Sequence, residues 1–272
     1  MRATRTHDRN RPHLPASGPR PAYAHPVLRI IDARTGEPTD AVRAPRSLVR
    51  VHARASGFDT TGLRVILVAD VLVRALELGG TPVWATVSSR AGLAELRAGA
   101  TALGVRPFED HQPAATGPAE AQTIDVFGPR GEGTGDAGTG DVGTGGVCVE
   151  VAPVEPGSGP VDPGVLRLAL LAHRRDEPLR LDAAVLADAD GTLTRWRAAV
   201  AAWATRPSRP VPDDVRQRLR AAWEDDLDVP GVLRVLRWVE TSDVPEGARF
   251  ETYAYADRLL GLELTRDIGA SL

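Results

Sequence analysis

The residues from Phe58 to Val65, FDTTGLRV, join a strand-like run, LVRVHA, to an apolar helix-like run, VILVADVLVRALEL. In α/β proteins a strand, a glycine-containing turn and a helix often hold a nucleotide, because backbone N–H groups at a helix N-terminus attract phosphate. This turn contains no histidine or lysine, and threonine donates one hydrogen bond but cannot become a cation. The candidate nucleotide-binding residues are Phe58, Asp59, Thr60, Thr61, Gly62 and Arg64.

Two further candidates for chemistry, Asp188 and Asp190, lie in the stretch AVLADADGTLTRW. This pattern resembles the first motif of the haloacid dehalogenase-like phosphatases, and the resemblance implies Asp188 as nucleophile and Asp190 as general acid and base. The motif requires a strand before the nucleophile, whereas an apolar stripe at helical spacing runs through the same residues. The stripe consists of Leu186, Ala189, Leu193, Trp196, Val200 and Trp203. A solvated acidic helix face therefore competes with the phosphatase, which stays an alternative function.

The cysteine and lysine content restricts the chemistry further. Cys148 is the only cysteine and lies in the alternating run GVCVEVAP, which predicts an inert thiol packed in a half-buried strand. A cysteine-rich zinc site is excluded, and no zinc is expected. All 33 residues of the combined Lys and Arg count are arginine. Walker-type phosphate loops and Schiff-base chemistry are excluded, because both require lysine.

A glycine-rich tract, GEGTGDAGTGDVGTGG, contains literal GxGxxG matches such as Gly133, Gly135 and Gly138. A dinucleotide-binding fingerprint also needs a strand before it and a helix that opens within it, and the sequence indicates neither. We therefore predict a flexible loop over residues 128–146.

Strand-like and helix-like runs alternate between residues 27 and 127, which predicts a Rossmann-like α/β domain with a parallel sheet. Residues 147–155 could add one strand to it. Residues 160–272 contain several amphipathic runs joined by short proline-containing breaks, which predicts a C-terminal α-helical bundle. The basic, proline-rich residues 1–26 predict a disordered arm.

Composition limits the partners. The net charge is −3, and no basic stripe with interleaved aromatic residues is present, so tRNA binding is doubtful and no strong field attracts nucleic acid. No apolar run approaches the ~20 residues that cross a bilayer. We expect no membrane association and a cytoplasmic protein.

Two blocks resemble the class I cysteine-activating enzymes, namely cysteinyl-tRNA synthetase and the mycothiol cysteine ligase. In the first, VRVHARASGFDTTGLRVILVADVLVRALELGG resembles the strand, signature turn and helix that begin their catalytic fold. In the second, DPGVLRLALLAHRRDEPLRLDAAVLADADGTLTRWRAAV and WEDDLDVPGVLRVL resemble the helices that follow the catalytic domain. The resemblance implies a Rossmann-like fold, ATP as the nucleotide and a helical C-terminal domain.

The departures from this family concern its catalytic charges. Matching Phe58 and Asp59 to the family's Tyr-Asp places Thr60 to Leu63 at the HIGH-type signature, whose imidazoles bind ATP phosphates. The family's zinc-ligand cysteine falls at Ala53, and its lysine-rich mobile loop has no counterpart. Arg64 or the pair Arg174 and Arg175 could replace part of the positive charge, although surface salt bridging is the competing interpretation.

We therefore predict a degenerate cysteinyl-tRNA synthetase-like protein, a pseudoenzyme that retains at most a small-molecule or nucleotide-binding cleft, or a regulatory binding role toward a protein partner. No catalytic residue is assigned, and ATP is the candidate ligand. The alternatives are an active ATP-dependent class I ligase, the phosphatase described above, and an interaction module that dimerises through its helical half.

Overall fold

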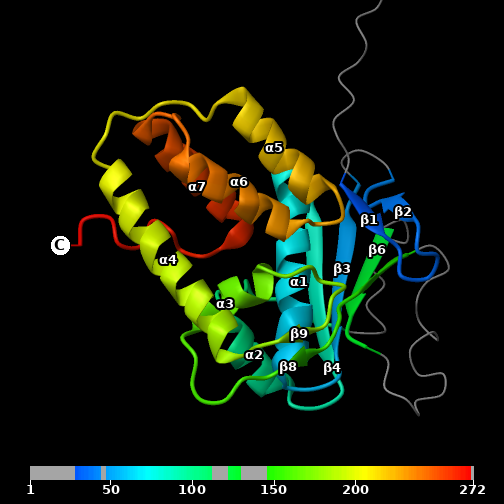
Figure 1. Cartoon of the computed structure of the whole chain (residues 1–272). Helices are drawn as coiled ribbons and strands as arrows, with labels where there is room; N and C mark the ends of the chain where they lie inside the picture. Colours follow the sequence, from blue (N-terminus) through cyan, green and yellow to red (C-terminus); the bar gives the residue numbers. More distant parts are fainter. Residues whose placement is uncertain (1–27, 44–46, 112–121, 130–145, 271–272) are drawn as a thin grey trace, which may run out of the picture.

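The computed structural model describes residues 28–43, 47–111, 122–129 and 146–270. Within these residues, a parallel sheet of five strands has the order β5-β4-β3-β6-β7 (Figure 1). Its strands are β3 (Val49–Ala55), β4 (Val83–Ser89), β5 (Glu109–Asp110), β6 (Gln122–Phe127) and β7 (Val147–Glu150). The α/β class and the Rossmann-like parallel sheet predicted from the sequence are confirmed.

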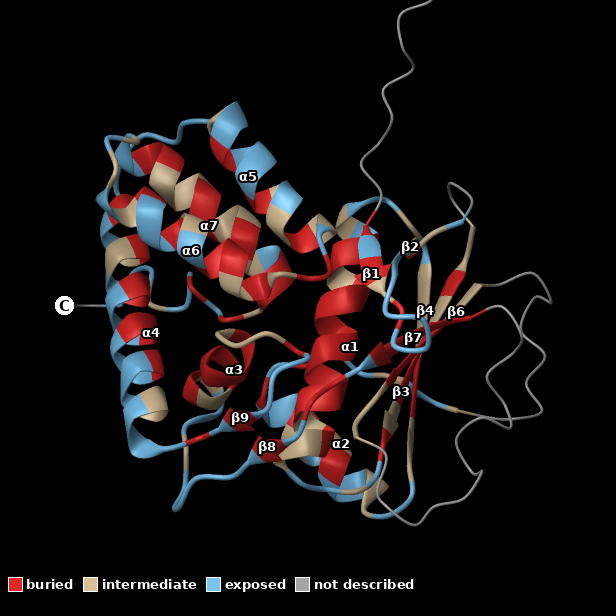
Figure 2. Cartoon of the chain, turned by 45° about the vertical axis from the view of Figure 1, so that its right-hand side comes forward, coloured by how far each residue is buried: buried red, intermediate tan, exposed pale blue. Residues whose placement is uncertain are grey.

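Helix α1 (Thr60–Leu78) packs against β3, β4 and β6, and α2 (Leu93–Ala102) lies beside α1. Most of α1 is buried, as Figure 2 shows by its red colour, because the sheet lies on one side of it and the C-terminal helices on the other. Its limits follow from capping chemistry. The carboxylate of Asp59 accepts a hydrogen bond at the N-terminus, and Gly80 adopts φ +81° just after the C-terminus.

The C-terminal region is helical, as predicted. Its helices are α3 (Pro163–Leu171), α4 (Ala183–Trp203), α5 (Asp213–Glu224), α6 (Val229–Thr241) and α7 (Glu246–Leu260). The apolar stripe of α4 is buried, apart from the partly buried Leu186. Trp196 and Trp203 both meet the ring of Tyr253 in α7 edge-on, with centroid distances of 5.6 and 5.2 Å, an arrangement that favours aromatic packing.

Four short strands connect the sheet to the helices. The antiparallel pair β1 (Arg29–Ile31) and β2 (Pro38–Asp40) lies beside β7, and β8 (Val154–Glu155) pairs with β9 (Leu179–Arg180). Of residues 147–155, the first four thus extend the main sheet, while β8 pairs outside it. Among the described residues, no helix combines the length and apolar character that crossing a membrane requires.

Asp226 fastens β1 to the helical region. Its carboxylate accepts hydrogen bonds from Arg175 and from the amide of Ile31 at 2.9 Å, and its own amide donates to the carbonyl of Arg29. Asp226 and the following Leu227 both have positive φ, at 54° and 53°. Because this conformation is unfavourable for residues other than glycine, these contacts must compensate the strain.

A buried ion cluster around Asp70 of α1 joins four segments of the chain. Its carboxylate, which is 0% exposed, lies 2.8 Å from Arg74, 3.2 Å from Arg106 and 3.1 Å from Arg167 of α3. Arg167 is 1% exposed and also donates to the carbonyls of Leu103 and Leu260, at 2.8 and 2.6 Å. Burial lowers the pKa of Arg167, which Asp70 opposes by favouring the cation.

Replacing Asp70 with Asn should destabilise the fold by about 3–5 kcal/mol, because the change leaves the buried Arg167 cation without its counter-charge. Chemical denaturation followed by circular dichroism measures this loss. The control is Glu155→Gln, since the ion pair between Glu155 and Arg180 is 76% and 78% exposed and its loss should change stability by about 0.5 kcal/mol or less. Equal effects of the two substitutions would contradict this role of Asp70.

Candidate nucleotide site at the switch point of the sheet

The strand order reverses direction between β3 and β6. From β3 the chain passes through α1 to β4 and then outward to β5, whereas β6 lies on the opposite side of β3. In open α/β sheets, ligands bind beyond the carboxyl ends of the strands at such a point. The candidate residues from Phe58 to Gly62 follow β3 directly, and Gly128 follows β6. A Cβ atom on Gly128 would lie 3.5 Å from the methyl group of Thr61, so the two strand ends meet at the predicted turn.

The carboxylate of Asp59 occupies the N-terminus of α1. One of its oxygens accepts a hydrogen bond from the amide of Gly62 at 2.6 Å. An anion stabilises this end of a helix, because the N–H groups there are unpaired and the helix dipole is positive. The position that a phosphate group would take is thus partly filled by a negative charge of the protein itself.

Gly62 has a steric reason to be glycine. A Cβ atom at this position would lie 2.4 Å from the carbonyl oxygen of Gly57, a distance that no side chain tolerates. The turn from Gly57 to Gly62 therefore closes tightly on itself. Phe58, at the outside of this turn, is 52% exposed and lies over Gly92 and Gly99 at the start and middle of the α2 segment.

The two threonines differ in their surroundings. Thr61 accepts a hydrogen bond from the amide of Val154 in β8 at 3.0 Å, which ties the start of α1 to the β8–β9 pair. Thr60 is half-buried in the first turn of α1. Neither side chain supplies the positive charge that a triphosphate requires, in agreement with the residue types.

Arg64 lies in the interior and is 1% exposed. Its guanidinium donates to the carbonyls of Ala152 at 3.2 Å, Glu177 at 2.8 Å and Arg174 at 2.5 Å. Burial lowers its pKa to about 10, so the side chain stays protonated at neutral pH. The structure thus places Arg64 away from the turn that precedes α1, where it holds the β7–β9 connection against the helix.

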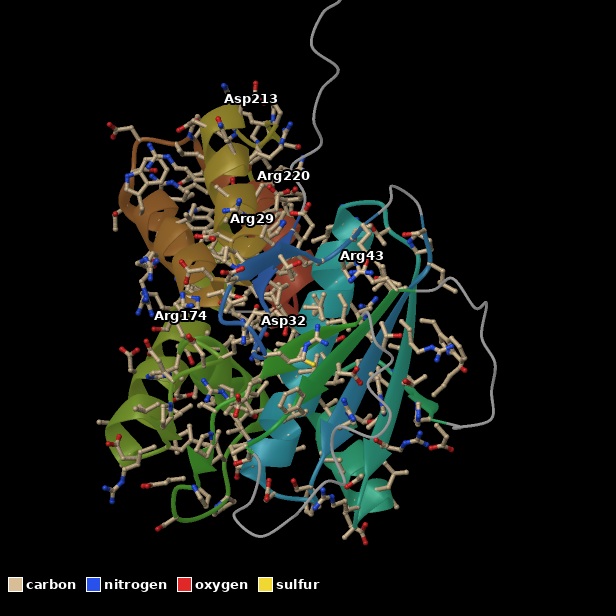
Figure 3. All side chains as sticks on the ribbon, turned by 90° about the vertical axis from the view of Figure 1, so that its right-hand side faces the viewer. Arg29, Asp32, Arg43, Arg174, Asp213 and Arg220 are labelled. Atoms are coloured by element: carbon tan, nitrogen blue, oxygen red, sulfur yellow. The ribbon has the colours of Figure 1, made fainter. Side chains whose placement is uncertain are left out.

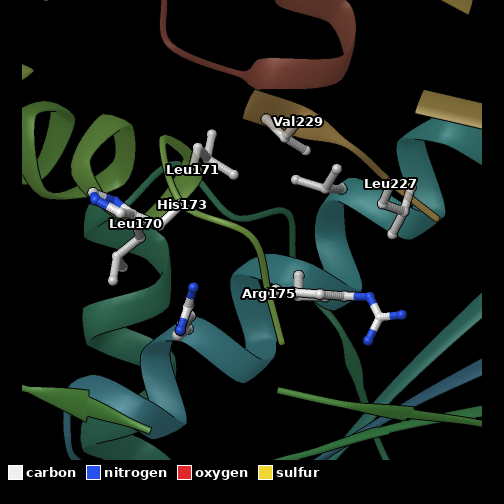
Figure 4. A pocket seen from close by; sticks show the side chains of 9 residues that line it. Leu170, Leu171, His173, Arg175, Leu227 and Val229 are labelled. Carbon is white, nitrogen blue, oxygen red and sulfur yellow. The ribbon is translucent and has the colours of Figure 1, made fainter. Parts of the chain in front are cut away.

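A cavity beside Arg64 is too small for a nucleotide. It lies between α1, α3 and the start of α6 and has a volume of about 20 Å³ (Figure 4), which is room for about one water molecule. Its lining is mostly aliphatic and includes Val68, Leu170, Leu171 and Val229. This cavity is a packing defect between the sheet-covering helix and the helical region.

The arginine pair proposed from the sequence as a replacement charge is used in ion pairs. Arg175 is 9% exposed and contacts Asp226 and the carbonyl of Glu150. Arg174 lies 3.3 Å from Asp226 and 3.1 Å from Asp176. Figure 3 shows Arg174 at the side of the helical region, between it and the β1 strand that carries Arg29. These contacts favour the salt-bridging interpretation of the pair.

The phosphatase interpretation is wrong. Asp188 and Asp190 lie within the continuous helix α4, which begins after the N-cap Asp182, and both side chains are exposed. The strand and loop that would aim a nucleophilic aspartate at a phosphate are therefore missing from this segment. The helical spacing of the apolar stripe, which competes with the motif, describes the segment correctly.

Other sequence predictions concern Cys148 and the glycine tract. Cys148 is 1% exposed in β7, and burial raises the pKa of its thiol, which agrees with an inert packed residue. The GxGxxG match at Gly133 lies outside the described residues. Among those that are described, no group of three or more His, Cys, Asp or Glu side chains is arranged to hold a metal ion.

A polar group on the other face of the sheet escaped the sequence reasoning. His52 of β3, Ser88 of β4 and Asp125 of β6 meet there, and the ring of His52 stacks on that of His111. The available signal is the alternation of Arg50, His52 and Arg54 within an otherwise apolar strand, which marks a polar face. The partners could not be found from it, because strand register brings them together.

Known proteins match part of the chain, although no family model matches it. The L-cysteine:1D-myo-inositol 2-amino-2-deoxy-alpha-D-glucopyranoside ligase of Catenulispora acidiphila is 43% identical over 88 residues, which is 32% of this chain and 20% of the ligase. The ligases of the same name from Streptosporangium roseum and Streptomyces scabiei are 39% and 38% identical over 108 and 109 residues, which is 38% of this chain and 26% of each ligase.

The matched region thus makes up 20% to 26% of the length of these curated relatives. Their name agrees with the family whose blocks the sequence resembles. Over the part that aligns, and with the parallel sheet and helical C-terminal region described above, this chain is similar to the mycothiol cysteine ligases, a cysteinyl-tRNA synthetase-like family of class I.

Proposed function

We propose that this chain is a degenerate relative of the class I cysteine-activating ligases that does not form a cysteinyl adenylate. It keeps a small-molecule or nucleotide-binding cleft at the start of α1 and acts by binding, as a regulatory partner of another protein. The observation that carries the proposal is the chemistry of the turn from Phe58 to Leu63. It offers two threonine hydroxyls at the positions that match the HIGH-type signature, where the family has imidazoles, and a hydroxyl cannot become a cation.

The energetic argument concerns the transition state. Forming an adenylate places additional negative charge on the phosphate that is attacked, and preorganised donors or cations must stabilise it. The loss of one such contact typically costs ~3–4 kcal/mol, or ~10²–10³ in rate, and several losses together are not additive. Arg64 is the nearest cation in the sequence, but its guanidinium donates to three backbone carbonyls and not to the turn. A cleft can survive such losses where catalysis does not.

An active ATP-dependent ligase is the second candidate. The 43% identity to a curated cysteine ligase favours it, as does the location of the turn at the switch point of the sheet. The two candidates differ in one measurable respect. An active ligase consumes ATP in the presence of cysteine, whereas the proposed protein binds the nucleotide without turnover.

We expect no cysteine-dependent exchange between ATP and pyrophosphate above the rate without protein, because no side chain in the turn is placed to stabilise the developing charge. Radiolabelled pyrophosphate exchange measures it, with an authentic cysteine ligase as positive control. Exchange that depends on cysteine and disappears in the double variant Thr60→Ala, Thr61→Ala would overturn the proposal in favour of the active ligase.

Asp59→Asn should bind ATP more tightly than the parent protein. Asparagine caps a helix about as well as aspartate, so α1 keeps its start while the charge that repels phosphate is removed. Two unit charges at this kind of partly exposed site interact by about 1 kcal/mol or more, which corresponds to about fivefold in Kd. The thermal shift as a function of ATP concentration measures the change, since a ligand at 100 times its Kd adds ~2.7 kcal/mol to the folded state.

Asp162→Asn provides the matched control, because Asp162 caps α3 in the same way, with bonds to Gly164 and Val165, but lies away from the switch point. It should leave the ATP-dependent shift unchanged. If neither the parent protein nor Asp59→Asn responds to ATP, the nucleotide cleft is absent and only the binding role toward a partner remains.

A further inference from the structure

Three side chains from separate strands converge on the face of the sheet opposite α1, the face toward the viewer in Figure 3. In β3 the alternate residues Val51 and Ala53 are buried beneath α1, so His52 between them points to the other face. His52 is aligned with Thr86 of β4 and Asp125 of β6. Ser88 lies two residues beyond Thr86 and therefore on the same face.

The distances form a relay from Ser88 to Asp125. Nε2 of His52 lies 2.9 Å from the hydroxyl oxygen of Ser88, and Nδ1 lies 3.4 Å from a carboxylate oxygen of Asp125. The carboxylate of Asp125 faces Nδ1 and favours the tautomer that carries its proton on this nitrogen, since a carboxylate accepts but does not donate. Nε2 is then the acceptor for the hydroxyl proton of Ser88, which is the arrangement that activates a serine.

The relay is mostly buried and is contacted by His111 and Arg54. His52 is 6% exposed and Asp125 is 3% exposed. The ring of His111 stacks on that of His52 at a centroid distance of 3.9 Å and an angle of 13°. The guanidinium of Arg54 lies 3.0 Å from the same oxygen of Asp125 that faces His52. Ser88, at the outer end of the relay, keeps part of its surface accessible.

A donor without a partner lies beside the relay. The hydroxyl of Thr86 is buried, with the residue 2% exposed, and has no hydrogen-bond partner among the described residues. An unpaired buried hydroxyl is costly to keep. Thr86 lies on the same face of β4 as Ser88, so this face keeps a polar group that the described residues do not satisfy.

We propose that Ser88 is a nucleophile toward activated acyl groups, that is, small carboxylic esters, with His52 as its base and Asp125 as the residue that orients His52. The oxygen of Ser88 attacks the ester carbonyl while its proton passes to Nε2 of His52. The leaving alcohol takes that proton as the ester bond breaks. Water then repeats the steps on the acyl-serine, which releases the carboxylic acid and restores the hydroxyl.

This activity goes beyond the proposed function and is independent of it. It uses the sheet face opposite α1, whereas the proposed nucleotide cleft lies at the α1 N-terminus. Loss of nucleotide binding in an α1 variant therefore leaves the reaction of Ser88 unchanged, and the two ideas fail separately.

The neighbouring serine provides a matched control. Ser89 follows Ser88 in β4, so its side chain points to the opposite face, and its hydroxyl donates to the carbonyl of Ala91 at 2.7 Å. The two serines share sequence surroundings and strand, but only Ser88 contacts an imidazole. Ser88→Ala and Ser89→Ala each remove one hydroxyl with little change in volume.

The test is covalent labelling of the full chain with a fluorophosphonate probe, in which serine displaces fluoride from phosphorus, followed by mass spectrometry of the peptides. We expect a single label on Ser88, lost in Ser88→Ala and retained in Ser89→Ala. His52→Gln should slow the labelling by about 10²–10⁴, the usual contribution of a positioned general base. The release of p-nitrophenol from p-nitrophenyl acetate should fall in the same order across these variants.

Circular dichroism of each variant confirms that it is folded before it is compared. The proposal is overturned if the parent protein takes up no probe under conditions that label a reference serine esterase within minutes. It is also overturned if Ser88→Ala and Ser89→Ala label equally, because the reaction would then not depend on the relay.

Discussion

The buried charge of Asp70 is the constraint on which the arrangement of the two halves depends. A carboxylate that is 0% exposed in the middle of α1 is stable only when cations contact it. These cations are Arg74 of α1, Arg106 after α2 and Arg167 of α3. Arg167 then carries the connection to the end of α7 through the carbonyl of Leu260. The helical region is thus fixed on α1 by directional bonds in addition to apolar packing.

Arg64, near the start of α1, is likewise a buried charged residue that joins separate segments of the chain. Its guanidinium satisfies three carbonyls of the segments that lead into and out of α3, so the arginine that lies nearest to the candidate site serves the fold. The residues at the α1 N-terminus show the same pattern, since Asp59 caps the helix and Thr61 holds β8. Asp59, Thr61 and Arg64 thus stabilise structure, which supports the proposed loss of catalysis.

Sequence reasoning predicted the features that depend on local pattern. The alternation of strands and helices, the glycine-containing turn before α1 and the apolar stripe of α4 follow from residue types and periodicity, which a single segment carries. It could not predict that Arg64 turns inward, because the carbonyls it contacts come from residues far along the chain. The relay from Ser88 to Asp125 could not be predicted either, because its residues come from three strands and only the register of those strands brings them together. The phosphatase-like motif at Asp188 and Asp190 was misleading for the opposite reason. It is a local match, but the apolar stripe of the same segment makes it a helix.

The hydrogen bonds between β1 and Asp226 affect how the chain folds during its synthesis. Ile31 and Asp226 are 195 positions apart in sequence, and contacts of such separation form slowly because a long loop must close first. A ribosome synthesising ~5–20 residues per second needs about 10–40 s to cover this interval. During that time β1 and β2 lack the helical region that holds them. Once β7 has been made, its outer edge is open to pairing with another chain. Pairing of this edge with another chain before Asp226 has been made would compete with correct assembly.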